Sequence, residues 1–153
     1  MNTIFGREFI EQATSRITSL AFAFPLTPGK AEERRRWGEE ILGPRRSEYQ
    51  ALRHRLGLTA HRIYLQQTPQ GDVGIIYLEG ENLQRAFQEL RTSQDPFVVW
   101  FRQRVKDLLN GLDLTQTSPG SLSKLVFDWP SREEDEASYH AWEAMERLGL
   151  VSP

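Results

Sequence analysis

Histidine is the most versatile acid–base side chain near neutral pH, and this sequence contains three histidines. His61 is the strongest candidate, because it stands near the start of an expected strand. There it either serves as a catalytic acid–base group or simply closes the end of a sheet. His54 lies between two arginines and His140 lies in an acidic segment, so both are expected at the surface. The three positions lack the spacing of metal ligands, and no metal is expected.

Polar and aromatic side chains alternate along the strand that follows His61. Arg62, Tyr64 and Gln66 share one face of that strand, and Tyr77 on the next expected strand is a candidate neighbour. One interpretation is a polar wall in an apolar pocket, with Tyr64 as a second acid–base candidate and with Gln66 and Tyr77 binding substrate. The same face would also suit an edge strand exposed to water, or a dimer contact.

A helix is expected over residues 30–57, and Gly43-Pro44 interrupts it as a kink or as two abutting helices. In a continuous helix, Arg45 and Glu48 would fall on the apolar stripe, three residues apart and close enough to pair. Arg45 would then line a cavity and fix an anionic or carbonyl group, with Glu48 beside it. Alternatively, the break changes the helical phase and both charges face water.

The composition of the chain excludes several classes of protein. Its 153 residues suggest one domain, and the absence of cysteine excludes disulfide scaffolds, thiolate metal sites and cysteine nucleophiles. Nineteen basic and 21 acidic side chains give a net charge of −2, which argues against a nucleic-acid partner. Neither a membrane-spanning run nor a secretory leader is present, so a cytoplasmic protein is expected. Nucleotide-binding motifs are absent, and no cofactor is expected.

The elements that must position these residues follow a ferredoxin-like order. The expected strands cover residues 15–24, 60–67, 73–79 and 123–129, and the expected helices cover residues 30–57, 82–91 and 96–109. This βαββαβ order predicts an α+β fold with a four-stranded antiparallel sheet and helices on one face. Residues 1–14 would be an N-terminal extension, residues 15–130 the domain, and residues 131–153 an acidic C-terminal helix that stops at Gly149.

Both faces of the expected sheet carry apolar side chains, so the face without helices needs another cover. Candidates for that face are Ala21, Ile63, Leu65, Ile75 and Phe127, or their alternates in the other register. A homodimer that packs two sheets face to face is the simplest solution. The C-terminal helix is a second possible cover.

The chain resembles the dimeric α/β-barrel superfamily over about residues 15–130. The similarity lies in the strand that leads into Pro28-Gly29-Lys30, in the hairpin at residues 60–79, and in the helix start at Asp95-Pro96-Phe97. The superfamily includes antibiotic-biosynthesis monooxygenases, lactone isomerases, haem-degrading enzymes and many uncharacterised bacterial proteins. The resemblance implies a homodimer and a small-molecule ligand. For an enzyme, it implies cofactor-independent oxygenation or isomerisation of a hydrophobic cyclic substrate.

A different class of function is also open. Trp100 falls off the inward face of its helix, which suits a pocket rim with a role in substrate binding, an interface, or a contact with the C-terminal segment. The acidic C-terminal helix suits recognition of another protein. The alternative to a ligand-binding protein or enzyme is therefore a non-catalytic dimeric interaction module that uses this helix.

Overall fold

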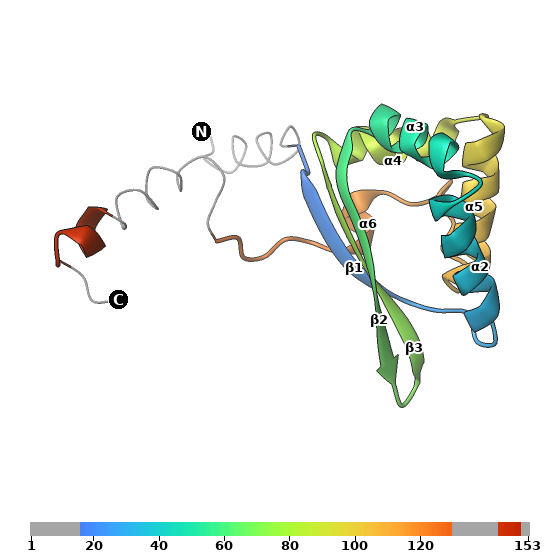
Figure 1. The fold of residues 1–153 in the computed structure, drawn as a ribbon, viewed down its shortest axis with the longest axis horizontal. Coiled ribbons are helices and arrows are strands. Elements are labelled where there is room, and N and C mark those ends of the chain that lie inside the picture. Colours follow the sequence, from blue (N-terminus) through green and yellow to red (C-terminus); the bar gives the residue numbers. More distant parts are fainter. Residues whose placement is uncertain (1–15, 130–143, 151–153) are drawn as a thin grey trace, which may run out of the picture.

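The computed structural model describes residues 16–129 and 144–150, and it has an α+β fold (Figure 1). Its elements are β1 (Ser19–Pro25), α2 (Ala31–Leu42), α3 (Arg46–Leu56), β2 (Leu58–Thr68), β3 (Gly71–Gly80), α4 (Leu83–Thr92), α5 (Pro96–Leu108) and α6 (Pro119–Leu122). The three strands form one antiparallel sheet in the order β1-β3-β2. The predicted N-terminal extension lies outside the described residues.

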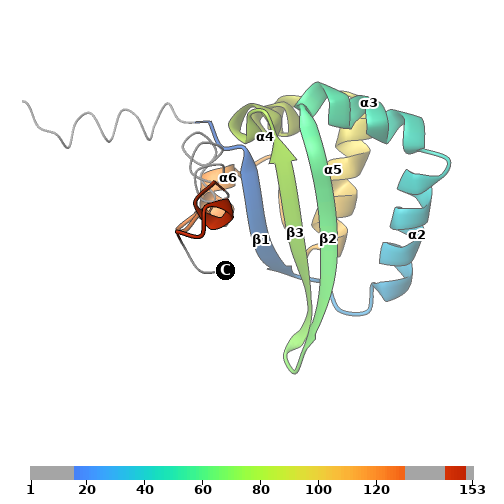
Figure 2. The same cartoon turned by 60° about the vertical axis from the view of Figure 1, so that its left-hand side comes forward.

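The helices α2, α3, α4 and α5 all lie on one side of the sheet (Figure 2). Leu20 and Phe22 of β1 and Ile76 and Leu78 of β3 point into this side and are buried. They pack against the apolar faces of α3, α4 and α5 in a single core, in which Leu83 is fully buried. Burial of this apolar area supplies the main favourable free energy of folding.

The opposite face of the sheet stays open among the described residues. Strand pairing places three side chains in one row across it, because Ala23 lies opposite Ile75 and Ile75 lies opposite Tyr64. Ala23 is exposed, and 56% of Tyr64 is exposed. Of the candidates for this face, Ala21 and Ile75 lie on it, whereas on β2 the alternate register holds and Ile63 and Leu65 do not. These residues lie on the helix side of β2 with His61, because side chains alternate along a strand.

The break expected at Gly43-Pro44 is confirmed, and it divides the long helix into α2 and α3. The end of α3 is confirmed as well. Gly57 adopts φ of 66°, the left-handed conformation that glycine tolerates best, and its N–H bonds the carbonyl groups of Arg53 and His54. The polypeptide turns there directly into β2, so the last turn of α3 lies at the end of the sheet where β2 begins (Figure 2).

A fourth strand over residues 123–129 is absent from the described fold. Only the Ser123 hydroxyl bonds β1, donating to the Ala21 carbonyl oxygen at 2.5 Å, and the chain then leaves the sheet beyond the edge of β1 (Figures 1 and 2). An antiparallel continuation from this contact would bring Phe127 opposite Ile17. The Ile17 N–H and C=O are already bonded to the Gln84 side chain and the Leu83 N–H. The pairing therefore could not extend as far as Ile17.

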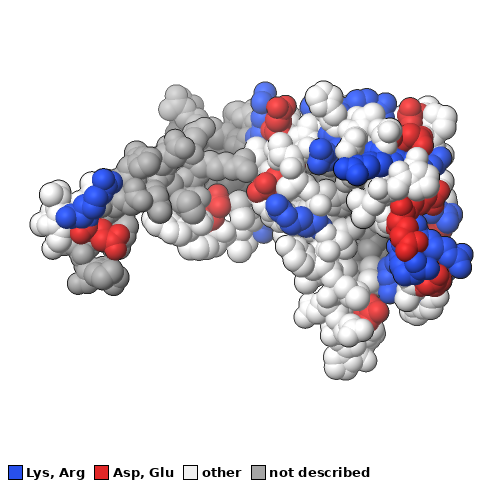
Figure 3. Space-filling view, in the orientation of Figure 1, with Lys and Arg blue, Asp and Glu red and all other residues white. Residues whose placement is uncertain are grey.

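The segment after α6 instead leaves a series of apolar side chains in contact with water. The exposed fractions of Leu125, Val126, Phe127 and Trp129 are 64%, 90%, 81% and 73%. The β2–β3 hairpin also extends past the helices, and few charges lie on it compared with the helical layer (Figures 1 and 3). Contiguous exposed apolar side chains of this kind usually mark an interaction surface.

The end of the C-terminal helix is described over residues 144–150, whereas residues 130–143 lie outside the description. The expected stop at Gly149 is confirmed. The Gly149 N–H bonds the Glu146 carbonyl, and the Leu150 N–H bonds the Met145 carbonyl, which is the hydrogen-bond pattern of a Schellman motif. In the described parts of the chain, none of the helices has the length and apolar character needed to cross a membrane.

Candidate functional site

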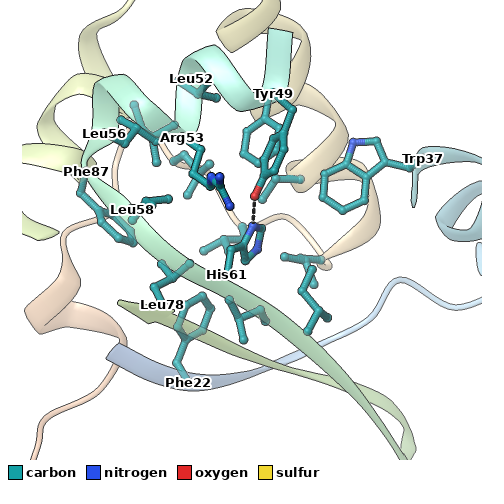
Figure 4. A pocket seen from close by; sticks show the side chains of 18 residues that line it. Phe22, Trp37, Tyr49, Leu52, Arg53, Leu56, Leu58, His61, Leu78 and Phe87 are labelled. Atoms are coloured by element: carbon teal, nitrogen blue, oxygen red, sulfur yellow. Dashed lines mark hydrogen bonds between the residues drawn. The ribbon is translucent and has the colours of Figure 1, made fainter. Parts of the chain in front are cut away.

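A cavity of about 80 Å³ lies between the helix-covered face of the sheet and the helices. All three strands and the helices α2–α5 contribute to its lining, which is almost entirely aliphatic and aromatic. The polar side chains in the lining are Trp37, Tyr49, Arg53 and His61 (Figure 4). An apolar pocket with a few polar side chains in it is the usual form of a small-molecule site.

The centre of the polar group is a hydrogen bond between α3 and β2. The Tyr49 hydroxyl lies 2.5 Å from Nδ1 of His61 (Figure 4). The Tyr49 ring also stacks on Phe101 of α5, with ring centroids 6.3 Å apart. The Tyr49 side chain is therefore held at two points, its ring by Phe101 and its hydroxyl by the imidazole. A polar pair at a fixed position in an apolar lining can orient a ligand.

Burial shifts the pKa values of both partners toward their neutral forms. Desolvation lowers the pKa of His61 to about 4 and raises the pKa of Tyr49, although the nearby positive charge of Arg53 partly opposes the second shift. Both side chains are therefore neutral at pH 7. A neutral imidazole with a pKa near 4 is a weak base, but it is a good hydrogen-bond donor or acceptor.

The hydrogen bond to Tyr49 controls what the other imidazole nitrogen can do. When the hydroxyl donates to Nδ1, Nε2 of His61 carries the proton and can donate it to a ligand. When Nδ1 donates to the hydroxyl, Nε2 presents a lone pair. The pair can thus present either a donor or an acceptor at Nε2.

Of the residues expected from sequence, the structure places only His61 in this cavity. Arg45 begins α3 as its N-cap residue and leaves the cavity side. Its guanidinium lies over the Trp100 ring at 4.1 Å, and its Nε lies 3.5 Å from Glu48. Arg45, Glu48 and Trp100 thus form a separate contact between α3 and α5, stabilised by a cation–π interaction and an ion pair.

Tyr64, Gln66 and Tyr77 lie on the open face of the sheet, on the side opposite to His61. There the Arg62 guanidinium lies 5.7 Å from the centre of the Tyr77 ring, and the Tyr77 hydroxyl donates to Glu79. His61 and Tyr64 therefore do not converge on one reacting group. The residues expected to act together are distributed over three places in the molecule.

Sequence reasoning missed Tyr49 and Arg53, which complete the polar group around His61. Both lie on α3, whose phase starts anew after the break at Gly43-Pro44. Counted from the start of α3 alone, Tyr49, Leu52, Arg53 and Leu56 have the spacing i, i+3, i+4 and i+7 of one helix face. That spacing could have identified them, had the two helices been treated separately.

The described residues contain no cluster of His, Asp or Glu side chains that could hold a metal ion. The chain matches no protein-family model and no curated protein. The resemblance to the dimeric α/β-barrel superfamily therefore stays a prediction, and the function must be inferred from the site itself.

Proposed function

We propose that this protein binds a small, largely apolar cyclic molecule in the cavity between the sheet and the helices. The observation that carries the proposal is the Tyr49–His61 hydrogen bond in an otherwise apolar lining. A buried polar pair costs free energy of folding relative to apolar side chains of the same shape. A role in orienting a bound molecule gives a reason for keeping the pair at this position.

The chemistry of the pair favours a ligand that carries a carbonyl or a related oxygen. In its neutral form His61 can donate from Nε2 to such an oxygen while Tyr49 holds Nδ1. Hydrogen bonding to a carbonyl stabilises the negative charge that develops when a neighbouring C–H bond loses its proton. For an enzyme, the proposed reaction class is isomerisation, or oxygenation of a ring by O2 without a cofactor, and the proton passes to water because no described carboxylate lines the cavity and His61 is a weak base.

Cyclohexanone is a suitable first probe, because it combines an apolar ring with one carbonyl oxygen. We expect it to shift the methyl NMR signals of the residues that line the cavity. Ile63→Trp should abolish those shifts, because Ile63 lines the cavity yet is 50% exposed, so that a larger side chain can enter without unfolding the core. Leu42→Trp is the matched control, since Leu42 is 74% exposed and lies outside the lining.

Equal shifts in the Ile63→Trp and Leu42→Trp variants would show that cyclohexanone binds elsewhere. Absence of shifts in the wild-type protein would contradict the proposed function for a cyclic ketone.

We propose further that two copies pair through the open face of the sheet. The support is the row formed by Ala23, Ile75 and Tyr64, which no described element covers. The fourth strand expected over residues 123–129 belongs to the same proposal, because its exposed side chains would become buried at such an interface. Sedimentation equilibrium at micromolar concentration should give twice the mass of the 17.7 kDa chain, and a stable monomer would contradict the pairing.

The end of the C-terminal helix favours a second candidate function, recognition of another protein. Met145, Leu148 and Leu150 are 38%, 73% and 70% exposed in the described segment. If the protein is an interaction module, Leu148→Glu should abolish binding of its partner and leave the cavity unchanged. If the cavity carries the function, the same substitution should leave cyclohexanone binding intact.

A further inference from the structure

The polar side chains that line the cavity are mostly hydrogen-bond donors. Arg53 and the Trp37 indole can only donate hydrogen bonds, and the Tyr49–His61 pair keeps one O–H or N–H to donate beyond the bond between its two members. None of the residues that line the cavity is acidic. The indole N–H of Trp37 is buried and has no acceptor among the described residues. The lining therefore carries no formal negative charge, and its polar groups are mostly hydrogen-bond donors.

Two arginines of α3, Arg46 and Arg53, have no ion pair with a described carboxylate, and of these only Arg53 lines the cavity. Arg45 pairs with Glu48, and Arg55 lies 3.8 Å from Asp95. No carboxylate in the described part of the chain lies within ion-pair distance of Arg53, which lies one helical turn after Tyr49 on the same face. Its guanidinium turns toward the Tyr49 hydroxyl and the His61 ring (Figure 4).

The unpaired Arg53 lies between water and the apolar lining. Water screens its charge on the exposed side, whereas the apolar side chains screen it less on the side that faces the cavity. The positive charge of Arg53 already acts on the Tyr49 hydroxyl, where it favours the deprotonated oxygen. A negatively charged oxygen placed beside Tyr49 by a ligand would be stabilised by the same charge.

We propose that the ligand of this cavity is a small organic anion, and this inference rests on the proposed function. Its apolar ring enters the cavity, and its carboxylate or enolate oxygen binds Arg53 and the Tyr49 hydroxyl. An arginine can bind a carboxylate through two parallel N–H bonds, a geometry that a neutral amide cannot match. Arg53 is thus the residue that determines charge specificity, and the Tyr49–His61 pair orients the ring.

The size of the cavity places the charged end of the ligand at the opening. The cavity measures about 80 Å³, whereas an apolar cavity that admits benzene measures about 150 Å³. A six-membered ring would therefore fill the enclosed part and extend toward the solvent side. Arg53 is itself exposed, so it can meet the anionic group there.

Benzoate and benzamide test this inference, because they have nearly the same shape and differ in charge. Binding can be followed by the methyl NMR signals of the cavity lining. We expect the wild-type protein to bind benzoate at least tenfold more tightly than benzamide. Arg53→Met should remove that preference, whereas Arg53→Lys should retain part of it, because lysine keeps the charge but loses the planar fork.

Arg46→Met is the matched control, since Arg46 is an exposed residue of α3 that does not line the cavity. It should leave the preference unchanged. Equal affinities for benzoate and benzamide in the wild-type protein, or an unchanged preference in Arg53→Met, would overturn the anion inference. If cyclohexanone still binds in that case, the proposed function survives; if none of the three probes binds, both fail.

Discussion

The two faces of the sheet carry apolar side chains but differ in what covers them. On one face, Phe22 and Ile76 lie beneath α3, α4 and α5 and are nearly inaccessible to water. On the other face, Ala21, Ala23 and Tyr64 are exposed in the described chain. The helix-covered face holds the folding core and the cavity. The open face mixes apolar side chains with the polar side chains of Arg62, Gln66 and Glu79, and no described helix covers it.

Because of this difference, the helix-covered face contributes to the free energy of folding, whereas the open face would contribute to the free energy of association. The helix-covered face already buries its apolar area in one chain and stabilises the fold directly. Apolar side chains on the open face contribute little until a second surface covers them. Substitutions on the two faces should therefore change different measurements, and the following predictions test that separation.

The largest effect is expected in the core beneath the helices. Leu83→Ala should lower the free energy of unfolding by about 3 kcal/mol, because Leu83 is fully buried and its loss leaves a cavity. Leu65→Ala on the projecting hairpin should change it by less than about 0.5 kcal/mol, since Leu65 is 59% exposed. Urea denaturation measures both values. Similar losses for the two variants would contradict the division between covered and exposed apolar side chains.

A comparable effect is expected from pH, through the histidine in the covered cavity. The pKa of His61 falls from 6.5 in the unfolded chain to about 4 in the folded protein, so the unfolded chain binds more protons between these values. The stabilisation is therefore complete above pH 6.5 and is lost as the pH falls toward 4. The total loss from this group is about 3 kcal/mol.

Denaturation curves recorded between pH 4 and pH 7 measure this loss. His61→Asn should reduce the slope of stability against pH, because asparagine does not titrate. An identical slope in the variant would contradict the low pKa of His61.

Much of this fold could be predicted from local patterns in the sequence. The β2–β3 hairpin, the break before α3 and the start of α5 at Asp95 each have a local signal of turn or cap residues, and the structure confirms them. Local patterns could not predict whether residues 123–129 pair as a fourth strand. Residues 123–129 have strand character, but pairing depends on whether β1 and the residues before it offer free backbone groups.

The candidate site was harder to predict, because it depends on the helical phase after a break. Arg45 would face the sheet in a continuous helix, yet it caps α3 and lies over Trp100. Arg53 takes the position that had been expected of Arg45, beside Tyr49 in the cavity lining. A change of phase of this kind follows from three-dimensional packing and is not encoded in the spacing of residues 30–57 as one helix.

A smaller effect is expected on the open face, and it concerns association. Tyr64→Glu should raise the dissociation constant of the proposed dimer at least tenfold, about 1.4 kcal/mol, because it would bury an unpaired carboxylate between two sheets. Leu65→Glu is a close control, since the neighbouring side chain points to the other face of β2. Sedimentation velocity measures the constant. Equal effects of the two substitutions would contradict pairing through the open face.

The smallest effect is expected at the cap that positions α5 over the covered face. The Asp95 carboxylate accepts hydrogen bonds from the N–H groups of Phe97 and Val98, at 2.9 and 3.4 Å. Asp95→Ala leaves these groups without a partner and should lower the free energy of unfolding by about 1 kcal/mol. Asp95→Ser can still cap the helix, although it loses the exposed ion pair with Arg55, which contributes little. In urea denaturation, Asp95→Ser should therefore keep most of the stability that Asp95→Ala loses. Equal losses of stability in the two variants would assign the effect to the ion pair with Arg55.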